Sequence, residues 1–517
     1  MSPNPHRSAE RDPDSDTDPA GVAQHTSGVS RRHVLGGIGA AASSPLFVGE
    51  QPATASPHAL STELANPNWR HSGNLRGLVA AAGKEKEGRF GVMFKKLEAY
   101  RPPDELLRKL AAQLTEPTDL DLNNPRIPAG FTFLGQFIDH DMTLDRSPLS
   151  DQTKDPDGLT NFQSPLFDLS SMYGIGGPDK NPDLYEPDGS GRLRVTRNVN
   201  GVDDLPRRAD GVALIGDGRN DENLIVSQLH LLFIKFHNRC LTTGLASSFA
   251  EAQRLTRWHF QWIIVNDYLA HVAGSEVVKL FLNGTTFEGQ FYKPKNPFRP
   301  MMPIEYSVAA FRFGHSMVRG GYPMNSRSDG FALIFGAEGS DLRGSRPLPA
   351  RFEIEWPRFF SMPGQSVPLT PSRIIDARLS QPMFRLPPTV VNDGVVSLAL
   401  RNLTRGRDLS LPAGQDVARA MGIPPISNTE LGIPDPGWAG KAPLWFYILK
   451  EAELQQQGRR LGQVGGRLVT EVILGILDAD KTSYLTAKRN PFRPVPPIAP
   501  SAGQFTMGDF VKFARGL

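Results

Sequence analysis

The chain has 517 residues and a formal net charge of only +3, with charges of both signs mixed along its length. This balance gives no nucleic-acid footprint, and 39% hydrophobic residues are enough for a large buried core. The only cysteine, Cys240, excludes an intramolecular disulfide and is expected to be buried packing. Beyond the N-terminal segment we find no internal repeat and no apolar run long enough to span a membrane.

The first sixty residues are expected to lie outside the folded domain. Residues 1–28 are rich in Pro, Asp, Ser and Ala, a composition typical of a disordered tail. Arg31 and Arg32 then precede a Gly- and Ala-rich, weakly apolar stretch, which indicates a signal peptide of the twin-arginine type. A small-x-small cleavage site would fit near Ala53–Ala55. We therefore predict a protein exported to the periplasm or the outside of the cell, although an unstructured basic tail explains the same residues.

Residues 61–517 are predicted to form one large domain of the mainly α class, with few short strands and long ordered loops. Its 50 glycines and 45 prolines, counted over the whole chain, favour short elements. Apolar residues recur at three- and four-residue spacing in three segments, which we predict to be helices: 104–114, 222–241 and 462–477. One segment, 351–356, alternates as a strand would. The domain exceeds the usual size of a single core, which suggests an interior organised around something besides side chains.

The first cluster of polar residues lies in the segment 131–145. Gln136, Asp139 and His140 stand at positions i, i+3 and i+4, so on a helix they share one face. Phe133 and Phe137 accompany them, and polar groups in such surroundings need partners or a ligand. Taken alone, the segment is equally explained by a core helix with one satisfied histidine.

Two further clusters occur later in the chain. Arg219 and Glu222 lie three residues apart at the start of the predicted helix 222–241, where they could simply pair with each other. His315 lies on an apolar stripe of the segment 305–320, and Gly314 leaves room beside it for a flat cofactor. A histidine on such a stripe is more commonly part of the core.

Four segments in order resemble the animal-type haem peroxidases, the superfamily that also includes the cyclooxygenases. Gly135–Asp141 is similar to the distal-histidine signature, and Gly216–Asn223 is similar to the distal-arginine segment. Phe311–His315 resembles the proximal-histidine segment, and Leu400–Asp408 resembles the segment that holds this histidine. The resemblance runs from about residue 88 to the C-terminus, and implies a bacterial, exported member with haem b as its cofactor.

The resemblance implies a role for each matched residue. His315 would be the axial iron ligand, with its other N–H held by Asn402. His140 would act on hydrogen peroxide as general base and then as general acid, and Arg219 would stabilise the developing negative charge. Gln136 would hold water or a small anion near the iron. The activity implied is reduction of peroxide through a ferryl intermediate, with oxidation of small donors such as phenols, amines, bromide or iodide.

Asp139 and Glu222 match the two carboxylates that form ester links to haem in the mammalian members. Such links are made by turnover, so the sequence leaves covalent attachment open. Asn223 stands where the mammalian enzyme has methionine, which excludes a sulfonium link there and argues against strong chloride oxidation.

A calcium ion is expected from a different pattern. Asp141 follows the distal histidine and faces away from the haem side of its helix, and Ser164, Leu166, Asp168 and Ser170 offer oxygens at every second position. Hydroxyl, carbonyl and carboxylate oxygens suit calcium, and the stretch is similar to the family's calcium loop. A serine-rich turn without metal is the alternative.

Two other classes of function remain. A haem fatty-acid dioxygenase of the same superfamily carries a radical tyrosine three residues before the proximal histidine, where this chain has Arg312, which we count among the cofactor-binding residues. A non-catalytic exported binding protein would be expected to have lost part of the set Gln136, His140 and Arg219. His230, His237, His259 and His271 lie in apolar helical segments and are expected to be structural.

Overall fold

A computed structural model of the protein describes residues 88–115, 122–143, 160–161, 165–294, 300–391, 393–487 and 491–517. The predicted export signal, the domain boundary near residue 60 and Ser164 lie outside the described residues. No helix in the described ranges combines the length and the apolar character needed to cross a membrane.

The described chain is mainly helical, as predicted. The α-helices are α3 (Asp104–Gln113), α4 (Gly130–Met142), α5 (Ser170–Tyr173), α6 (Leu224–Thr242), α7 (Phe249–Ile263), α8 (Leu269–Val272), α9 (Ser275–Phe281), α10 (Leu398–Asp408), α11 (Gly414–Ala420), α12 (Leu444–Gln456), α13 (Gln463–Ala479) and α14 (Met507–Arg515). π-Helical segments are η6 (Ile264–Tyr268) and η7 (Glu305–Ala309). The 3₁₀ segments are η4 (Pro182–Leu184), η5 (Gly218–Asp221), η8 (Ala310–Met317), η9 (Ala350–Phe352), η10 (Trp356–Arg358), η11 (Gln381–Phe384), η12 (Pro436–Trp438) and η13 (Tyr484–Thr486).

The strands are short and form small separate sheets. Three strands pair in the order β3 (Thr160–Asn161), β1 (Gly88–Gly91), β8 (Met302–Pro303). The two-stranded pairs are β9 (Gly321–Pro323) with β10 (Phe331–Leu333), β2 (Asn123–Pro128) with β11 (Pro371–Arg373), β4 (Thr196–Arg197) with β5 (Asp203–Asp204), and β6 (Leu282–Asn283) with β7 (Thr286–Phe287). β1 is antiparallel to β3 and parallel to β8.

The three helices expected from apolar spacing are confirmed as α3, α6 and α13, with ends that differ by one or two residues. Helix α6 begins after Asn223, whose side chain accepts a hydrogen bond from the backbone N–H of Ile225 at 2.8 Å. Cys240 on the same helix is buried, as expected.

The strand predicted at 351–356 is wrong. Phe352, Ile354 and Trp356 are buried, so the alternation did mark one buried side. The backbone of this stretch has no partner strand, however: the N–H of Ile354 donates to the Gln228 side chain and the carbonyl of Phe352 accepts from it. The segment is therefore two 3₁₀ turns joined by extended residues, with Pro357 inside the second turn.

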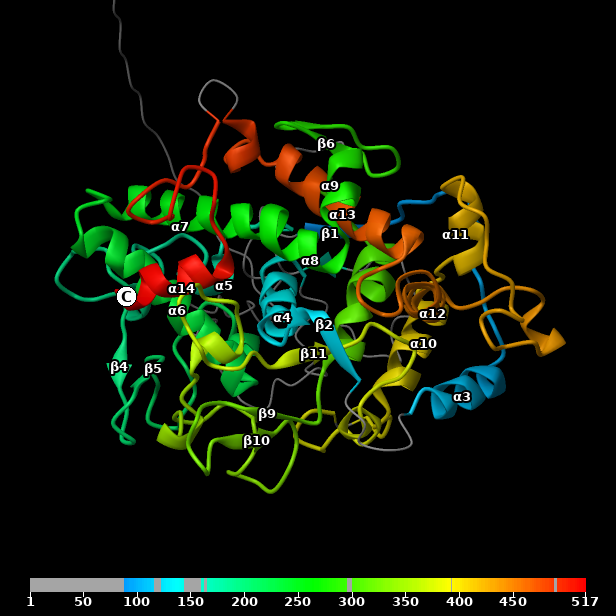
Figure 1. Cartoon of the computed structure of the whole chain (residues 1–517), viewed down its shortest axis with the longest axis horizontal. Helices are drawn as coiled ribbons and strands as arrows, with labels where there is room; N and C mark the ends of the chain where they lie inside the picture. The colour runs from blue at the N-terminus through cyan, green and yellow to red at the C-terminus, as the bar shows by residue number, and fades with distance from the viewer. Residues whose placement is uncertain are drawn as a thin grey trace, which may run out of the picture. The chain divides into compact units, whose positions relative to one another are not determined.

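Helix α4 lies at the centre of the arrangement that carries the predicted site. Figure 1 shows it between α6, α7 and α14 on one side and α10, α12 and α13 on the other. Direct packing joins α4 to α6, η5 and η8. The residues predicted to bind haem or to act on peroxide lie on or beside α4, η5, η8 and α10, so segments far apart in sequence converge there.

Buried histidines should make the protein sensitive to mild acid. Burial lowers the pKa of His230 to about 3 and the pKa values of His237 and His259 to about 4. In the unfolded chain a histidine takes up a proton near pH 6.5, whereas these buried histidines stay neutral in the folded protein until about pH 3–4. The free energy of unfolding is therefore unaffected by them above pH 6.5 and decreases as the pH falls from 6.5 toward 4. At pH 5 each of the three should cost about 2 kcal/mol of unfolding free energy relative to pH 7.

Denaturant unfolding at pH 7 and pH 5 checks this expectation. The decrease in the free energy of unfolding between pH 7 and pH 5 should be about 2 kcal/mol smaller in His259→Leu, because leucine does not take up a proton on unfolding. An equal drop in this variant and in the wild type would contradict the interpretation.

Candidate active site

The face of α4 predicted to be functional lies in the interior. His140 is buried, and Asp139 and Gln136 are partly buried beside it on the same helix. Asp139 accepts a hydrogen bond from the Thr143 hydroxyl at 3.0 Å. Burial raises the pKa of Asp139, although the positive charges of Arg219 and Arg312 act in the opposite direction.

Arg219 lies next to His140 and is held by a carboxylate. Its Nη2 donates to the backbone carbonyl of His140 at 2.9 Å and to Asp217 Oδ2 at 2.7 Å. Burial would raise the pKa of Asp217, but the Arg219 guanidinium outweighs it and the pKa falls to about 2. Asp217 therefore supplies a hydrogen-bonded ion pair of the kind that the sequence suggested for Glu222, whose charge also acts on Arg219.

The His140 ring is held by a neighbour of Arg219. His140 Nδ1 lies 2.8 Å from the amide oxygen of Asn220, and the amide nitrogen of Asn220 lies 3.0 Å from His230 Nδ1. Asn220 and His230 are completely buried. The contact links η5 and α6 to the distal face of α4.

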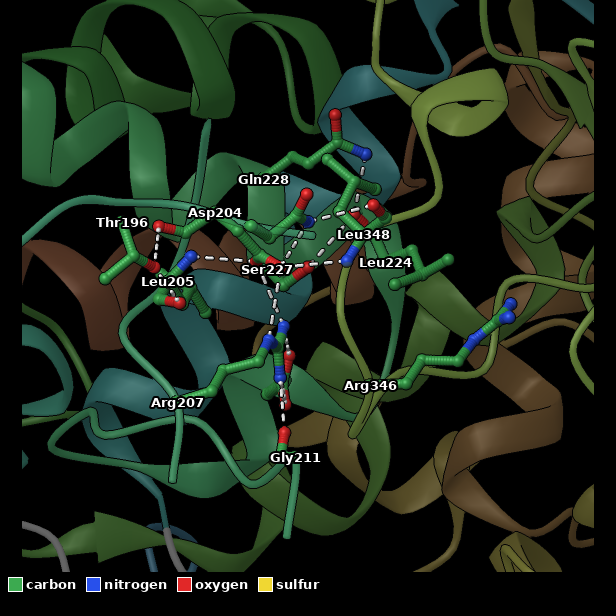
Figure 2. A network of polar contacts seen from close by, with 12 residues as sticks. Thr196, Asp204, Leu205, Arg207, Gly211, Leu224, Ser227, Gln228, Arg346 and Leu348 are labelled. Atoms are coloured by element: carbon green, nitrogen blue, oxygen red, sulfur yellow. Dashed lines mark hydrogen bonds and ion pairs between the residues drawn. The ribbon is translucent and has the colours of Figure 1, made fainter. Parts of the chain in front are cut away.

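The η5 turn that carries Arg219 and Asn220 is fixed by a buried ion-pair network. Arg207 donates to both oxygens of Asp221 at 2.6 and 2.8 Å, to Asp204, and to the carbonyl of Gly211 (Figure 2). At Gly344 a Cβ would come within 1.8 Å of the Asp221 carbonyl oxygen, so only glycine permits this approach. Burial raises the pKa of Asp221 to about 6 despite the Arg207 charge.

Arg207→Met should lower the free energy of unfolding by about 3–5 kcal/mol, because two buried carboxylates lose their shared cation. Urea denaturation at neutral pH measures this loss. Arg208→Met is the matched control: this neighbour pairs with Asp210 at the surface, where solvent screens the charges, so its replacement should change the free energy of unfolding little. Equal losses in the two variants would refute the assigned role of Arg207.

His315 lies on η8, which packs against α4 and α12. Its Nδ1 lies 2.8 Å from Asn402 Nδ2 on α10, so the contact expected from the resemblance is present. We expected the amide oxygen of Asn402 to face the His315 ring, but its amide nitrogen does. The oxygen, Oδ1, points to Arg312 and accepts a hydrogen bond from Arg312 Nη1 at 3.1 Å. In this arrangement His315 Nδ1 accepts a hydrogen bond, and a half-turn of the amide would make it a donor.

The segment around His315 is helical but not α-helical. A π turn, η7, passes directly into the 3₁₀ turn η8, and the backbone at Ala309 departs from helical angles. An ideal Cβ at Gly314 would meet nothing within 4 Å, which is the open space that the sequence predicted beside His315. Arg312 also donates to the carbonyl of Ser307 at 3.0 Å.

A second polar cluster joins the end of α4 to α5. Asp141 is completely buried and accepts hydrogen bonds from the backbone N–H groups of Leu169 and Ser171 and from the Ser171 hydroxyl. Burial and the charge of nearby Asp168 raise the pKa of Asp141 well above its usual value. Asp168 in turn accepts from the N–H of Ser170 at 2.9 Å. The carboxylates of Asp141 and Asp168 therefore lie near each other in the interior, where each charge disfavours the other.

This cluster contains three of the five residues predicted to bind calcium, Asp141, Asp168 and Ser170, and Leu166 lies two residues before Asp168 in the chain. In the part of the chain that the structure describes, no three His, Cys, Asp or Glu side chains converge as a metal site. A cation here would therefore depend on hydroxyl and carbonyl oxygens in addition to the two carboxylates. Such a mixed oxygen set fits calcium.

Several residues of the site were missed in the sequence. Asp217 has a usable signal, since an Asp two residues before a predicted catalytic Arg can cap the turn and pair with it; its Oδ1 accepts from the Arg219 N–H. The sequence contains no signal that would have predicted the contact between Asn220 and His230. Tyr268 and Tyr306 are buried, and their pKa values are raised by burial and then by the charge of Asp139 among other groups.

The other histidines expected to be structural have local partners. His237 contacts the Tyr173 hydroxyl and the carbonyl of Gly191. His259 and His271 each bond through Nδ1 to the carbonyl four residues earlier, and His271 also pairs with Asp267. Among these four histidines, the structure connects His230 to the candidate site.

Comparison with known proteins identifies the family. The model of the animal haem peroxidase family matches residues 126–431, and the chain belongs to that family. It is 26% identical over 260 residues to a chorion peroxidase of Drosophila melanogaster, covering 46% of this chain and 31% of the relative. It is 24% identical over 245 residues to human thyroid peroxidase, covering 42% and 23%. The chain spans less than half the length of these curated relatives.

Solved structures share the fold. Peroxidase A of Dictyostelium discoideum superposes with a TM-score of 0.56 at 17% identity, covering 81% of this chain and 92% of that one. The fatty acid alpha-dioxygenase of Oryza sativa, solved with palmitic acid, superposes with a TM-score of 0.54 at 16% identity, covering 82% and 84%. The fold is therefore shared with a solved peroxidase and with a solved fatty acid dioxygenase.

Proposed function

We propose that this protein is a haem-dependent peroxidase that reduces hydrogen peroxide and oxidises small donors such as phenols, amines, bromide or iodide. One observation carries the proposal: His140 and Arg219 are held together by hydrogen bonds. The Arg219 guanidinium donates to the backbone carbonyl of His140, and the Asn220 amide oxygen contacts the His140 ring. A proton acceptor beside a fixed cation is the pair of groups that heterolysis of a peroxide bond requires.

The residues around His315 fit the haem that the family name implies. His315 offers a ring nitrogen, Gly314 leaves open space, and Arg312 brings a positive charge that suits a carboxylate of the cofactor. When bound, haem would supply the two electrons that reduce the peroxide, and the small donor would then return them to it. Ligation through Nε2 requires the proton on Nδ1, and therefore the Asn402 carbonyl facing the ring.

The chain itself supplies the proton chemistry. In the proposal His140 takes the proton from one oxygen of hydrogen peroxide and delivers it to the other, which leaves as water. Arg219 stabilises the negative charge on the leaving oxygen, and Asp217 keeps the guanidinium aimed and charged. Gln136, one turn before His140, is proposed to hold a water molecule or a small anion.

Covalent attachment of haem is a finer part of the proposal. Asp139 and Glu222 are the carboxylates that would form ester links; burial raises the pKa of Asp139, and the charges of Arg219 and Arg312 oppose that rise. Mass spectrometry of acid-extracted protein after peroxide turnover tests this point. A mass increase by one haem supports the links, and complete extraction of haem excludes them.

A fatty-acid dioxygenase is the second candidate, because solved dioxygenases share the fold. The position three residues before His315 carries Arg312, so this chain has no phenol there to form the radical that the reaction requires. Oxygen uptake with palmitic acid, measured beside peroxide consumption with an aromatic donor, separates the two activities. A non-catalytic binding protein would show neither.

We also propose one calcium ion held by Asp141, Leu166, Asp168 and Ser170, with Ser164 as a fifth ligand. Removing it with a chelator should lower the melting temperature. A ligand at a hundred times its Kd adds about 2.7 kcal/mol of stability. Thermal unfolding with calcium and with EGTA measures the difference.

Asp168→Asn should weaken the response to calcium, and Asp188→Asn, which changes an exposed carboxylate that pairs with Arg192, should leave it unchanged. Identical melting temperatures of the wild type in calcium and in EGTA would contradict the site. The paired carboxylates would then be explained by their backbone hydrogen bonds alone.

Export by the twin-arginine route is proposed from Arg31 and Arg32. The full chain with both arginines replaced by lysine should accumulate in the bacterial cytoplasm, whereas the unchanged chain should be found outside it. Equal distribution of the two chains would contradict this route.

The experiment that tests the proposed function is peroxide consumption by the purified, haem-supplied protein, followed with guaiacol and then with iodide. Consumption that depends on the donor and on intact His140 supports it. A folded, haem-loaded protein that consumes peroxide with neither donor would overturn it.

A further inference from the structure

Two buried side chains continue inward from His140. The Asn220 amide lies between two imidazole rings, 2.8 Å from His140 Nδ1 through its oxygen and 3.0 Å from His230 Nδ1 through its nitrogen. Both Asn220 and His230 are completely shielded from solvent. His230 Nε2 is buried and makes no hydrogen bond within the described residues. The chain of contacts therefore ends at His230.

The order of donors and acceptors along this chain sets the tautomer of each ring. An amide nitrogen can only donate, so His230 Nδ1 accepts and carries no proton. The amide oxygen can only accept, so His140 Nδ1 carries the proton that it receives. The lone pair of the His140 ring is then on Nε2, the nitrogen that does not face Asn220.

His230 can fill this role because it stays neutral. Burial holds its pKa at about 3, so Nδ1 remains an acceptor at any pH at which the protein is expected to be folded. Phe137 packs edge-on against the His230 ring with centroids 6.0 Å apart, which limits rotation of that ring. Asn220 is fixed in turn by its place between Arg219 and Asp221, both of which are ion-paired.

We infer that Asn220 and His230 are positioning residues that hold His140 in the tautomer with its lone pair on Nε2, ready to take a proton from peroxide. The inference rests on the proposed function and deepens it. His230, expected from the sequence to be structural, thereby belongs to the catalytic machinery through Asn220.

Other charged groups bear on the protonation of His140. The elements packed against α4, and α4 itself, carry the following: Asp139 and Asp141 on α4, Asp217, Arg219 and Asp221 at η5, Lys235, His237 and Arg239 on α6 besides His230, Arg312 and His315 on η8, Arg126 on β2, and Arg373 on β11. Asp217 interacts with the His140 charge directly. A test must therefore change Asn220 or His230 while leaving these groups in place.

Cyanide binding to the ferric, haem-loaded protein provides such a test, because bound cyanide gives up its proton to a nearby base. Affinity and binding rate are read from the visible spectrum between pH 4.5 and 9. Asn220→Asp should raise the acid midpoint of cyanide binding by about one pH unit or more, since a carboxylate on Nδ1–H favours charged His140. His230→Leu should slow binding at pH 7 by about tenfold.

Two variants separate positioning from general damage. His230→Asn keeps an acceptor oxygen near the place of Nδ1 and should restore most of the binding rate. His259→Leu removes another buried, neutral histidine that has no bond to the site and should leave the cyanide profile unchanged. Melting temperatures report the stability of every variant independently.

The outcomes are distinct. An unchanged acid midpoint in Asn220→Asp, or equal slowing in His230→Leu and His259→Leu, would overturn the inference and leave the proposed function standing. A wild-type protein that takes up no haem and binds no cyanide would overturn the proposed function and the inference with it.

Discussion

Replacing His140 with alanine should lower the rate constant for reaction with hydrogen peroxide by about 10²–10⁴-fold while the protein keeps its haem. The expected loss is large because His140 is the buried base beside Arg219, with its Nδ1 already engaged by Asn220. Alanine removes the proton acceptor and leaves the guanidinium in place. Stopped-flow mixing of ferric protein with peroxide measures the rate constant directly.

His237→Gln serves as the control for this variant. His237 lies on α6 and is buried, but its partners are Tyr173 and Gly191, away from the candidate site. Its rate constant should stay within threefold of the wild type. A similar small change in His140→Ala would show that His140 is not the base.

Replacing Arg219 with glutamine should lower the same rate constant by about 10²–10³-fold, because the charge on the leaving oxygen loses its fixed cation. The variant has a second, measurable consequence. Burial raises the pKa of Asp217, and the Arg219 charge is the main influence that holds it at about 2. Without that charge burial should raise the pKa of Asp217, and activity should acquire a new dependence on pH.

Arg208→Gln is the matched control, because Arg208 pairs with Asp210 outside the candidate site. It should change neither the rate constant nor its pH profile. If Arg219→Gln retains the wild-type rate constant, stabilisation of the leaving oxygen must come from another group.

The sequence was sufficient to predict the main helices and the family. Long apolar repeats of α3, α6 and α13 are local signals, and each of these helices buries the face that the repeat marks. The order of four short motifs predicted that α4, η5, η8 and α10 converge, which the packing of α4 with η5 and η8 and of η7 with α10 supports. The motifs therefore predicted which segments lie close together in the folded chain.

The sequence did not predict how the side chains of the site are oriented. The Asn402 amide is turned by Arg312, ninety residues away along the chain, and Asn220 bonds to a histidine on the next helix. Such orientations depend on which donors and acceptors meet after folding, and spacing carries no information about this. The strand predicted at 351–356 failed for a related reason: alternation reports a buried side, whereas a strand also needs a partner.

The spacing of apolar residues also could not predict the irregular backbone around His315. The change from π to 3₁₀ turns between Glu305 and Met317 alters which residues share a face. The apolar stripe predicted for this segment assumed a uniform α-helical period. Its main conclusion, open space at Gly314 beside the histidine, does not depend on that period.

The most direct test of the account is the visible absorption spectrum of the purified protein, wild type and His315→Ala, after both have been supplied with haem. We expect a Soret band from one haem per chain in the wild type, retained in His140→Ala and lost or displaced in His315→Ala. A folded wild-type protein without a Soret band, or an unchanged band in His315→Ala, would contradict the assignment of the site.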